Sequence, residues 1–253
     1  MLPGMRSLVT RISAACALTV LLAATGIAPA SAESQGVAGT TVFLDPGHNG
    51  VNDSTLTQQV PNGRGGTKDC QTTGTSSDSG FPEHTLNWDV VQRIRGILDG
   101  LGVNTALSRT SDTGVGPCVD QRAAMANALH PDAIVSVHAD GGPAWGHGFH
   151  VNYSAPPVYD VQAGPTLNLA YTMKDALSAA GFSESDYLGS RGLFGRADLA
   201  GLNLAQFPAV LVEMGNMRNS ADAALMESAD GRQKYAIAIA DGIINYLKQG
   251  KQQ

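Results

Sequence analysis

The sequence predicts a single α/β domain: a mostly parallel, twisted sheet of about six strands covered by helices on both faces. Short apolar runs, the form of strands buried on both sides, alternate with segments whose apolar residues recur every three or four positions. No repeat, Gly/Ser-rich linker or second compositional block follows residue 32, and the remaining length suits one hydrophobic core.

The expected strands are recognised by continuous or alternating apolar residues. Residues 41–44, 133–137 and 208–212 are continuous apolar runs of the kind found in central strands. Residues 103–107 follow a glycine that ends the preceding helix, and 149–153 alternate as a half-buried strand does. A further short strand is expected near Leu193.

The expected helices carry apolar stripes that end at glycine. Leu86, Val90 and Ile94 follow three- and four-residue spacing in the first helix, 83–101, which Gly100 and Gly102 stop. Further helices are expected at 119–129, 167–180, 220–228 and 233–248.

Residues 1–32 have the pattern of a secretory signal peptide. Arg6 and Arg11 supply positive charge, residues 14–24 form a short apolar run, and Ala30-Ser31-Ala32 is a small-residue cleavage site. The apolar run is too short to span a bilayer comfortably, so we expect no stable membrane insertion. The protein is expected to be secreted, acting in the periplasm or cell wall.

The expected mature domain, residues 33–253, is acidic. Without the two arginines of the first 32 residues, 14 of the 16 Lys and Arg remain against 22 Asp and Glu, a formal charge of −8. This charge argues against a nucleic-acid partner, which would need a basic face. We expect a monomer with flexible tails at 33–39 and 249–253.

The two cysteines of this domain, Cys70 and Cys118, are expected to form a disulfide. Exported proteins meet an oxidising compartment, and neither cysteine has the CxxC spacing of a metal pair. The bridge would close a loop of about fifty residues, worth roughly 3–4.5 kcal/mol in the chain-entropy model. Cys70 lies in residues 50–80, a long Gly-, Ser- and Thr-rich loop of the kind that is usually functional or disordered.

Four polar residues lie where these elements begin or end. His48, His138 and Glu213 each follow or end an apolar strand, and Glu83 opens the first helix. Because the carboxyl ends of parallel strands meet at one edge, these side chains can converge. Two histidines and a carboxylate form a known ligand set of catalytic zinc, and Glu213 is suited to general base and acid. Singly, each has an ordinary explanation as a surface, capping or strand-end residue.

Other polar residues are candidates for the surroundings of this site. They are Asp45, Arg109, Arg122 and Asn127. Asp45 could orient His48 as a hydrogen-bond acceptor, or simply begin the turn. Arg109, Arg122 and Asn127 look structural. His147 and His150 flank Gly148 and could touch substrate, although a solvated loop is the expected setting.

A series of short motifs runs through the domain in a fixed order. They are Leu44-Asp45-Pro46-Gly47-His48, Glu83, Leu107-Ser108-Arg109, Arg122 with Ala126-Asn127, Ser136-Val137-His138-Ala139-Asp140, Gly148-Phe149, and Pro208-Ala209-Val210-Leu211-Val212-Glu213. Together they resemble the zinc-dependent N-acetylmuramoyl-L-alanine amidases of the amidase-3 type, most of all the single-domain mycobacterial members. The resemblance covers residues 41 to 247, nearly the whole expected mature chain.

This resemblance implies one zinc ion per chain, held by His48, Glu83 and His138, with Glu213 as the catalytic carboxylate. It implies hydrolysis of the amide between N-acetylmuramic acid and L-alanine in peptidoglycan or muropeptides. Two alternatives stay open: a zinc peptidase cutting within the stem peptide, and a non-catalytic murein-binding protein. The connection 49–82 is longer than usual in the family, and 139–148 leave no room for the inhibitory helix of many Gram-negative relatives.

Overall fold

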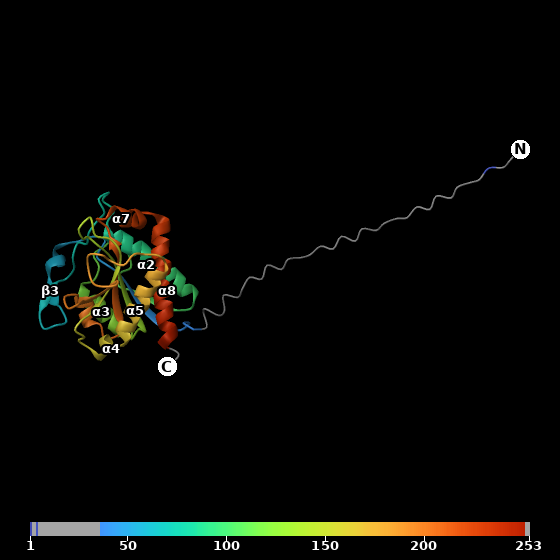
Figure 1. Cartoon of the computed structure of the whole chain (residues 1–253). Coiled ribbons are helices and arrows are strands. Elements are labelled where there is room, and N and C mark those ends of the chain that lie inside the picture. The colour runs from blue at the N-terminus through green and yellow to red at the C-terminus, as the bar shows by residue number, and fades with distance from the viewer. Residues whose placement is uncertain (2–3, 5–35, 251–253) are drawn as a thin grey trace. The chain divides into compact units, whose positions relative to one another are not determined.

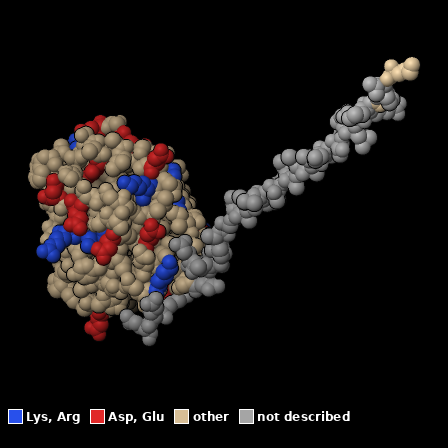
Figure 2. Space-filling view, turned by 45° about the vertical axis from the view of Figure 1, so that its right-hand side comes forward, with Lys and Arg blue, Asp and Glu red and all other residues tan. Residues whose placement is uncertain are grey.

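The computed structural model describes residues 1, 4 and 36–250. The expected signal peptide therefore lies outside the described residues, apart from Met1 and Gly4. Residues 36–250 belong to a single unit, in which no described helix has both the length and the apolar content needed to cross a membrane. On the face of this unit shown in Figure 2, acidic and basic side chains are interspersed.

A six-stranded sheet with the order β4-β1-β5-β8-β6-β7 forms the centre of the domain. The strands are β1 (Thr41–Pro46), β4 (Asn104–Leu107), β5 (Ala133–Asp140), β6 (His150–Ser154), β7 (Leu193–Arg196) and β8 (Ala209–Asn216). All neighbours pair in parallel except β6 and β8, which are antiparallel. The predicted mostly parallel sheet is confirmed, and so is the short strand near Leu193.

Helices cover both faces of the sheet, but unequally (Figure 1). The larger core lies under α2 (Glu83–Gly100), α5 (Pro165–Ala179) and α8 (Ala229–Gly250), and the smaller under α3 (Val119–Ala128) and α6 (Ala200–Leu204). Short helices α4 (Asp160–Ala163) and α7 (Ser220–Glu227) complete the chain. Because successive side chains of a strand point to opposite faces of the sheet, Val135 and Val137 of β5 pack in the larger core and Ile134 packs in the smaller one.

The segment 50–80 is more ordered than the loop expected from its composition. It contains a 3₁₀ turn, η1 (Ser54–Thr57), and an antiparallel hairpin of β2 (Gln59–Pro61) and β3 (Thr67–Asp69). At the hairpin tip, Arg64 donates hydrogen bonds to Asn203 Oδ1 and Ser154 Oγ, both at 3.0 Å. A disulfide joins Cys70 to Cys118, 48 positions away, at the start of α3.

The described ends of the domain are held more closely than the expected flexible tails. Val37 is fully buried in the larger core, and the Gly39 N–H donates to Gly102 O at 2.8 Å. At the other end, α8 extends through Gln249, whose Oε1 accepts a 2.9 Å hydrogen bond from Asn168. Residues 36–39 and 249–250 thus contact the rest of the domain; residues 33–35 and 251–253 lie outside the described part.

Replacing both Cys70 and Cys118 with alanine is expected to lower the free energy of unfolding by roughly 3–4.5 kcal/mol. The bridge restricts the unfolded chain, and its loss also removes two side chains that pack in a small cluster with Val60. Urea titration of the double variant beside reduced and oxidised wild-type protein measures the effect. Equal midpoints for oxidised wild type and the double variant would contradict this expectation.

Candidate metal centre and active site

His48, Glu83 and His138 converge at the carboxyl edge of the sheet. His48 follows β1, His138 lies near the end of β5, and Glu83 is the first residue of α2. The His48 Nε2 lies 2.9 Å from one Glu83 oxygen, and His138 Nδ1 lies 3.0 Å from the other. One donor atom from each residue lies within 4.8 Å of the others. The three side chains thus form a cluster able to hold a metal ion.

Two glycines leave the space that this cluster needs. A Cβ on Gly47 would lie 2.2 Å from the His138 ring, and a Cβ on Gly74 would lie 2.9 Å from the His48 ring and 3.0 Å from Glu83 Oε2. Gly74 also has φ +75°, which side chains rarely adopt. Two imidazole nitrogens and a carboxylate are donors that zinc accepts, so these residues fit a zinc ion.

Gly74→Ala is expected to weaken zinc binding about tenfold or more, because its Cβ would displace His48 or Glu83. Competition with a chelating dye measures the affinity. Gly80→Ala is a matched control, since Gly80 has φ +90° but nothing within 4 Å of an added Cβ. If Gly74→Ala and Gly80→Ala lose zinc affinity equally, the clash of the added Cβ with His48 or Glu83 is not the cause of the loss.

The electrostatics of the cluster favour an ionised carboxylate. Burial alone raises the pKa of Glu83, but hydrogen bonds from His138 and His48 outweigh it and hold the pKa well below its usual range. Asn87 Nδ2 and the Ala139 N–H, both 3.2 Å from Glu83 Oε1, add two further donors. A carboxylate held ionised in this way is ready to bind a cation.

Two buried arginines hold the backbone that carries His48. Arg109 Nε and Arg122 Nη1 both donate to the Pro46 carbonyl, at 3.0 and 2.9 Å. Arg122 Nη2 also donates to the His48 carbonyl at 2.8 Å, and Arg109 Nη2 to the His84 carbonyl at 2.7 Å. His48 has φ 64°, an unusual conformation for a side-chain-bearing residue that such contacts stabilise. The arginines therefore position the β1 end against the start of α2.

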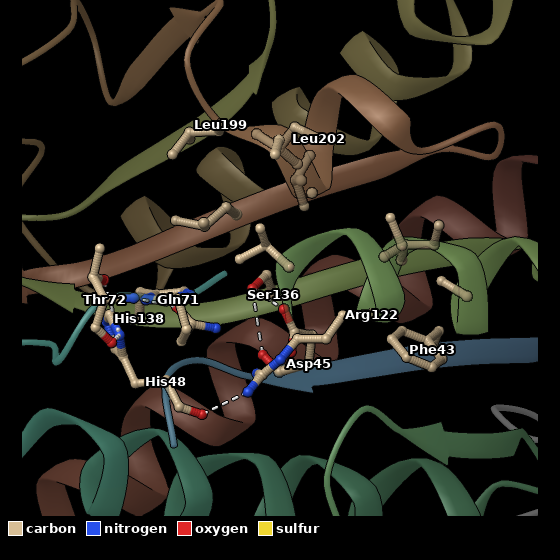
Figure 3. A pocket seen from close by; sticks show the side chains of 18 of the residues that line it. Phe43, Asp45, His48, Gln71, Thr72, Arg122, Ser136, His138, Leu199 and Leu202 are labelled. Carbon is tan, nitrogen blue, oxygen red and sulfur yellow. Dashed lines mark hydrogen bonds and ion pairs between the residues drawn. The ribbon is translucent and has the colours of Figure 1, made fainter. Parts of the chain in front are cut away.

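Asp45 bonds to Arg122, which together with Arg109 forms what we call the arginine framework. Its carboxylate accepts hydrogen bonds from Arg122 Nη1 at 2.8 Å and Ser136 Oγ at 2.7 Å (Figure 3). It also accepts one from Ser108 Oγ at 2.5 Å. Burial raises the pKa of Asp45, but the charge of Arg122 and the hydrogen bonds from the two hydroxyls outweigh this effect. The pKa of Asp45 therefore lies below its usual range. The two ring nitrogens of His48 instead contact the Thr72 carbonyl and Glu83.

The long loop supplies contacts that sequence reasoning missed. His48 Nδ1 donates to the Thr72 carbonyl at 2.9 Å, which leaves Nε2 facing Glu83. The Thr75 N–H donates to Glu83 Oε2 at 2.9 Å. No residue pattern in 50–80 signals these contacts, because both use the backbone. Deleting 52–79 would therefore disturb the cluster itself.

Asn127 lies apart from the cluster. Its amide donates to the Leu204 carbonyl at 3.0 Å and accepts from the Gln206 N–H at 2.9 Å. These contacts tie α3 to the chain after α6.

A cavity of about 130 Å³ lies beneath α3 and α6. It extends from Phe43, Ile134 and Leu202 to His48 and His138 (Figure 3).

Glu213 lies beside the cluster in the sheet. It pairs in register with His138 of β5 on one side and with His150 of β6 on the other. Its Oε2 is buried without a hydrogen-bond partner among the described residues. Burial raises the pKa of Glu213 well above its usual value, and Glu83 and Asp140 raise it further. A carboxyl group with a raised pKa is suited to take up a proton and return it.

His150 is not in a solvated loop, contrary to expectation. It is only 1% exposed, and its ring lies edge-on to Tyr187 and Phe194, with centroids 6.3 and 5.9 Å away. Burial lowers its pKa to about 4, so the imidazole is neutral at pH 7. His147 does lie at the surface and pairs with Asp186 at 3.4 Å.

The connection between β5 and β6 is short and rigidly held. It contains no helix, as the sequence predicted. Asn216 Nδ2 donates to the Pro143 and Gly146 carbonyls, each at 2.8 Å, and fixes the loop to the end of β8. No element of this connection therefore covers the cluster as a helical plug would.

Comparisons with known proteins agree on one family. Residues 42–245 match the Amidase_3 model, described as N-acetylmuramoyl-L-alanine amidase. The chain is 61% identical over 221 residues to the N-acetylmuramoyl-L-alanine amidase Rv3717 of Mycobacterium tuberculosis, covering 87% of this chain and 92% of that protein.

Solved structures give the same grouping. The N-acetylmuramyl-L-alanine amidase Ami1 of Mycobacterium smegmatis matches with a TM-score of 0.84 and 58% identity, over 85% of this chain and 99% of that one. AmiC2 of Nostoc punctiforme matches with a TM-score of 0.62 and 25% identity, over 84% and 99%. Since the family model spans most of the domain, the chain belongs to the Amidase_3 family of N-acetylmuramoyl-L-alanine amidases.

Proposed function

We propose that this protein is a secreted, zinc-dependent amidase that cleaves the amide between N-acetylmuramic acid and L-alanine in peptidoglycan or its fragments. One observation carries the proposal: the cluster of His48, Glu83 and His138 has the carboxylate Glu213 in register beside it. Family membership and the high identity to named muramoyl-alanine amidases support the substrate. The leader-like residues 1–32 support secretion to the periplasm or cell wall.

In the proposed mechanism, His48, Glu83 and His138 hold one zinc ion, and Glu213 moves the protons. Zinc, when bound, polarises the scissile carbonyl and increases the acidity of a water molecule. Glu213 takes a proton from the attacking water and then donates it to the leaving amide nitrogen. The raised pKa of Glu213 suits both roles, because the carboxyl group can hold the proton between the two transfers.

Surrounding residues keep this arrangement in place. Thr72 fixes the His48 ring through Nδ1, and Thr75 fixes the Glu83 carboxylate. The arginine framework of Arg109 and Arg122 holds the backbone of the β1 end. We propose that the loop 50–80 also borders the substrate, because Lys68, Gln71 and Thr72 line the cavity next to the two histidines.

Hydrolysis of muramyl dipeptide by the zinc-loaded protein is the test of this function. We expect release of L-alanyl-D-isoglutamine, loss of activity with chelator, and recovery when about one zinc per chain is restored. Mass spectrometry of the products separates the alternatives. Cleavage after L-alanine would indicate the stem-peptide hydrolase, and zinc binding without cleavage of this or larger fragments would indicate a binding protein.

A further inference from the structure

Two polar side chains, His150 and Asn152, lie near Glu213 on the face of the sheet that carries the smaller core. His150 pairs directly with Glu213, and Asn152 pairs with Leu211, two positions before it. Directly paired residues point to the same face of a sheet, as do residues two apart on one strand. Glu213, His150 and Asn152 are therefore neighbours on one surface.

Each of these side chains has a buried polar atom without a hydrogen-bond partner among the described residues. The atoms are Glu213 Oε2, His150 Nδ1 and Asn152 Oδ1. His150 is 1% exposed and Asn152 is fully buried. The orientation of the Asn152 amide follows from its Nδ2, which donates to the Leu211 carbonyl at 3.4 Å. Buried polar atoms of this kind are usually hydrogen-bonded, so three in adjacent positions call for one explanation.

The chemistry of the three atoms restricts that explanation. In the ionised form that the proposed general-base role requires, Glu213 Oε2 can only accept hydrogen bonds, as can Asn152 Oδ1, so the two atoms cannot bond to each other. A nitrogen of His150 that carries a proton can serve only one of them. A water molecule donates two hydrogen bonds and accepts two, and buried waters typically make about three. One water therefore satisfies all three atoms if His150 Nδ1 carries the proton.

We propose that Glu213, His150 and Asn152 act as one hydrogen-bonded unit, closed by a buried water, in which His150 positions the Glu213 carboxylate. The water donates to Glu213 Oε2 and Asn152 Oδ1 and accepts the Nδ1–H of His150. This arrangement sets the His150 tautomer and holds Glu213 at the side of His138. The proposal rests on the proposed function of Glu213, and nothing in that function requires His150.

The surroundings of His150 fit a neutral positioning residue. The charged groups that act on it are Asp140 and Arg196, and their effects on its pKa oppose each other. The Tyr187 hydroxyl donates to Asp140 Oδ2 at 3.0 Å, so it does not compete for the imidazole. The aromatic edges of Tyr187 and Phe194 fix the plane of the ring.

The kinetic test compares His150→Phe with His150→Asn on muramyl dipeptide. Phenylalanine keeps the packing but removes Nδ1, whereas the asparagine amide places a polar atom near the Nδ1 position. We expect His150→Phe to lower kcat about ten- to a hundredfold with KM and zinc content unchanged, and His150→Asn to recover most of the loss. His147→Phe, at the exposed neighbouring histidine, is the matched control and should leave kcat unchanged. Equal losses in both His150 variants, or none, would overturn the proposal.

A second measurement does not depend on activity. Nitrogen-15 NMR of histidine-labelled, zinc-loaded wild-type protein reports the tautomer of each of its six histidines. We expect His150, identified by the signal missing from His150→Asn, to be neutral with its proton on Nδ1 at pH 7, and Asn152→Leu to shift that signal. A proton on Nε2, or a charged ring, would disprove the unit. Lack of muramyl dipeptide hydrolysis by wild type with the Nδ1–H tautomer intact would instead count against the proposed function.

Discussion

Glu213→Gln is expected to lower kcat for muramyl dipeptide hydrolysis about a hundred- to ten-thousandfold, the usual loss of a general acid–base group. Glutamine has nearly the same shape but cannot take and return a proton. Zinc content should stay the same, because Glu213 is not one of the three proposed ligands. Steady-state kinetics and metal analysis on the same samples measure both quantities.

The stability of this variant provides an internal check. Removing the Glu213 charge also removes its repulsion by Glu83 and Asp140, so the melting temperature should hold or rise. Glu227→Gln is the matched control, since Glu227 lies at the end of α7 and accepts a hydrogen bond from Ser79. Near-normal kcat in Glu213→Gln would assign the proton transfers to another group.

Arg122→Met is expected to lower the free energy of unfolding by about 3–5 kcal/mol, the cost of leaving a buried charge without its partner. Arg122 is only 3% exposed and pairs with Asp45, and methionine cannot replace its bonds to the Pro46 and His48 carbonyls. Urea denaturation measures the loss. We also expect weaker zinc binding, because the backbone of His48 loses its support.

An exposed arginine is the control for this substitution. Arg95 forms an ion pair with Asp99 in which both side chains are 45% exposed, so Arg95→Met should cost less than about 1 kcal/mol. If Arg122→Met were as mild as Arg95→Met, the ion pair with Asp45 would not support the site.

The pH dependence of the Arg122 effect has a defined sign. The folded pKa of Asp45 lies below the ordinary value of 3.8, so its interactions stabilise the fold above that pH. This contribution decreases as the pH falls below about 4, toward the folded pKa. Wild type and Arg122→Met should therefore differ less in stability below about pH 4 than at neutral pH.

The ligand cluster could be predicted from the sequence because its residues are marked by local pattern. His138 directly follows the apolar run 133–137, His48 closely follows the run 41–44, and Glu83 opens a helix with a clear apolar stripe. Strand ends in a parallel sheet converge whatever the sequence distance between them. The fold class followed from the same alternation of strands and helices.

The surroundings of the cluster could not be predicted, because they depend on pairing and on backbone groups. The burial of His150 follows from the pairing of β6 with β8, which its position after Gly148 does not indicate. The contacts of Thr72 and Thr75 use main-chain atoms and leave no pattern in side-chain type. The partners of Asp45 are Arg122, Ser108 and Ser136, which lie on three other segments and which the residues next to Asp45 in sequence do not indicate.

The bridge between Cys70 and Cys118 links the oxidation state of the chain to the assembly of its metal ligands. Cys70 lies two residues before Thr72 and five before Thr75, which hold His48 and Glu83. Closing the bridge restricts this segment near the positions in which it supports the ligands, and binding free energies are reciprocal. Thiol oxidation should therefore raise zinc affinity, and zinc should make the bridge harder to reduce. We therefore expect a newly made chain to reach its full affinity for the proposed metal only after its cysteines are oxidised, which would separate synthesis from hydrolytic competence.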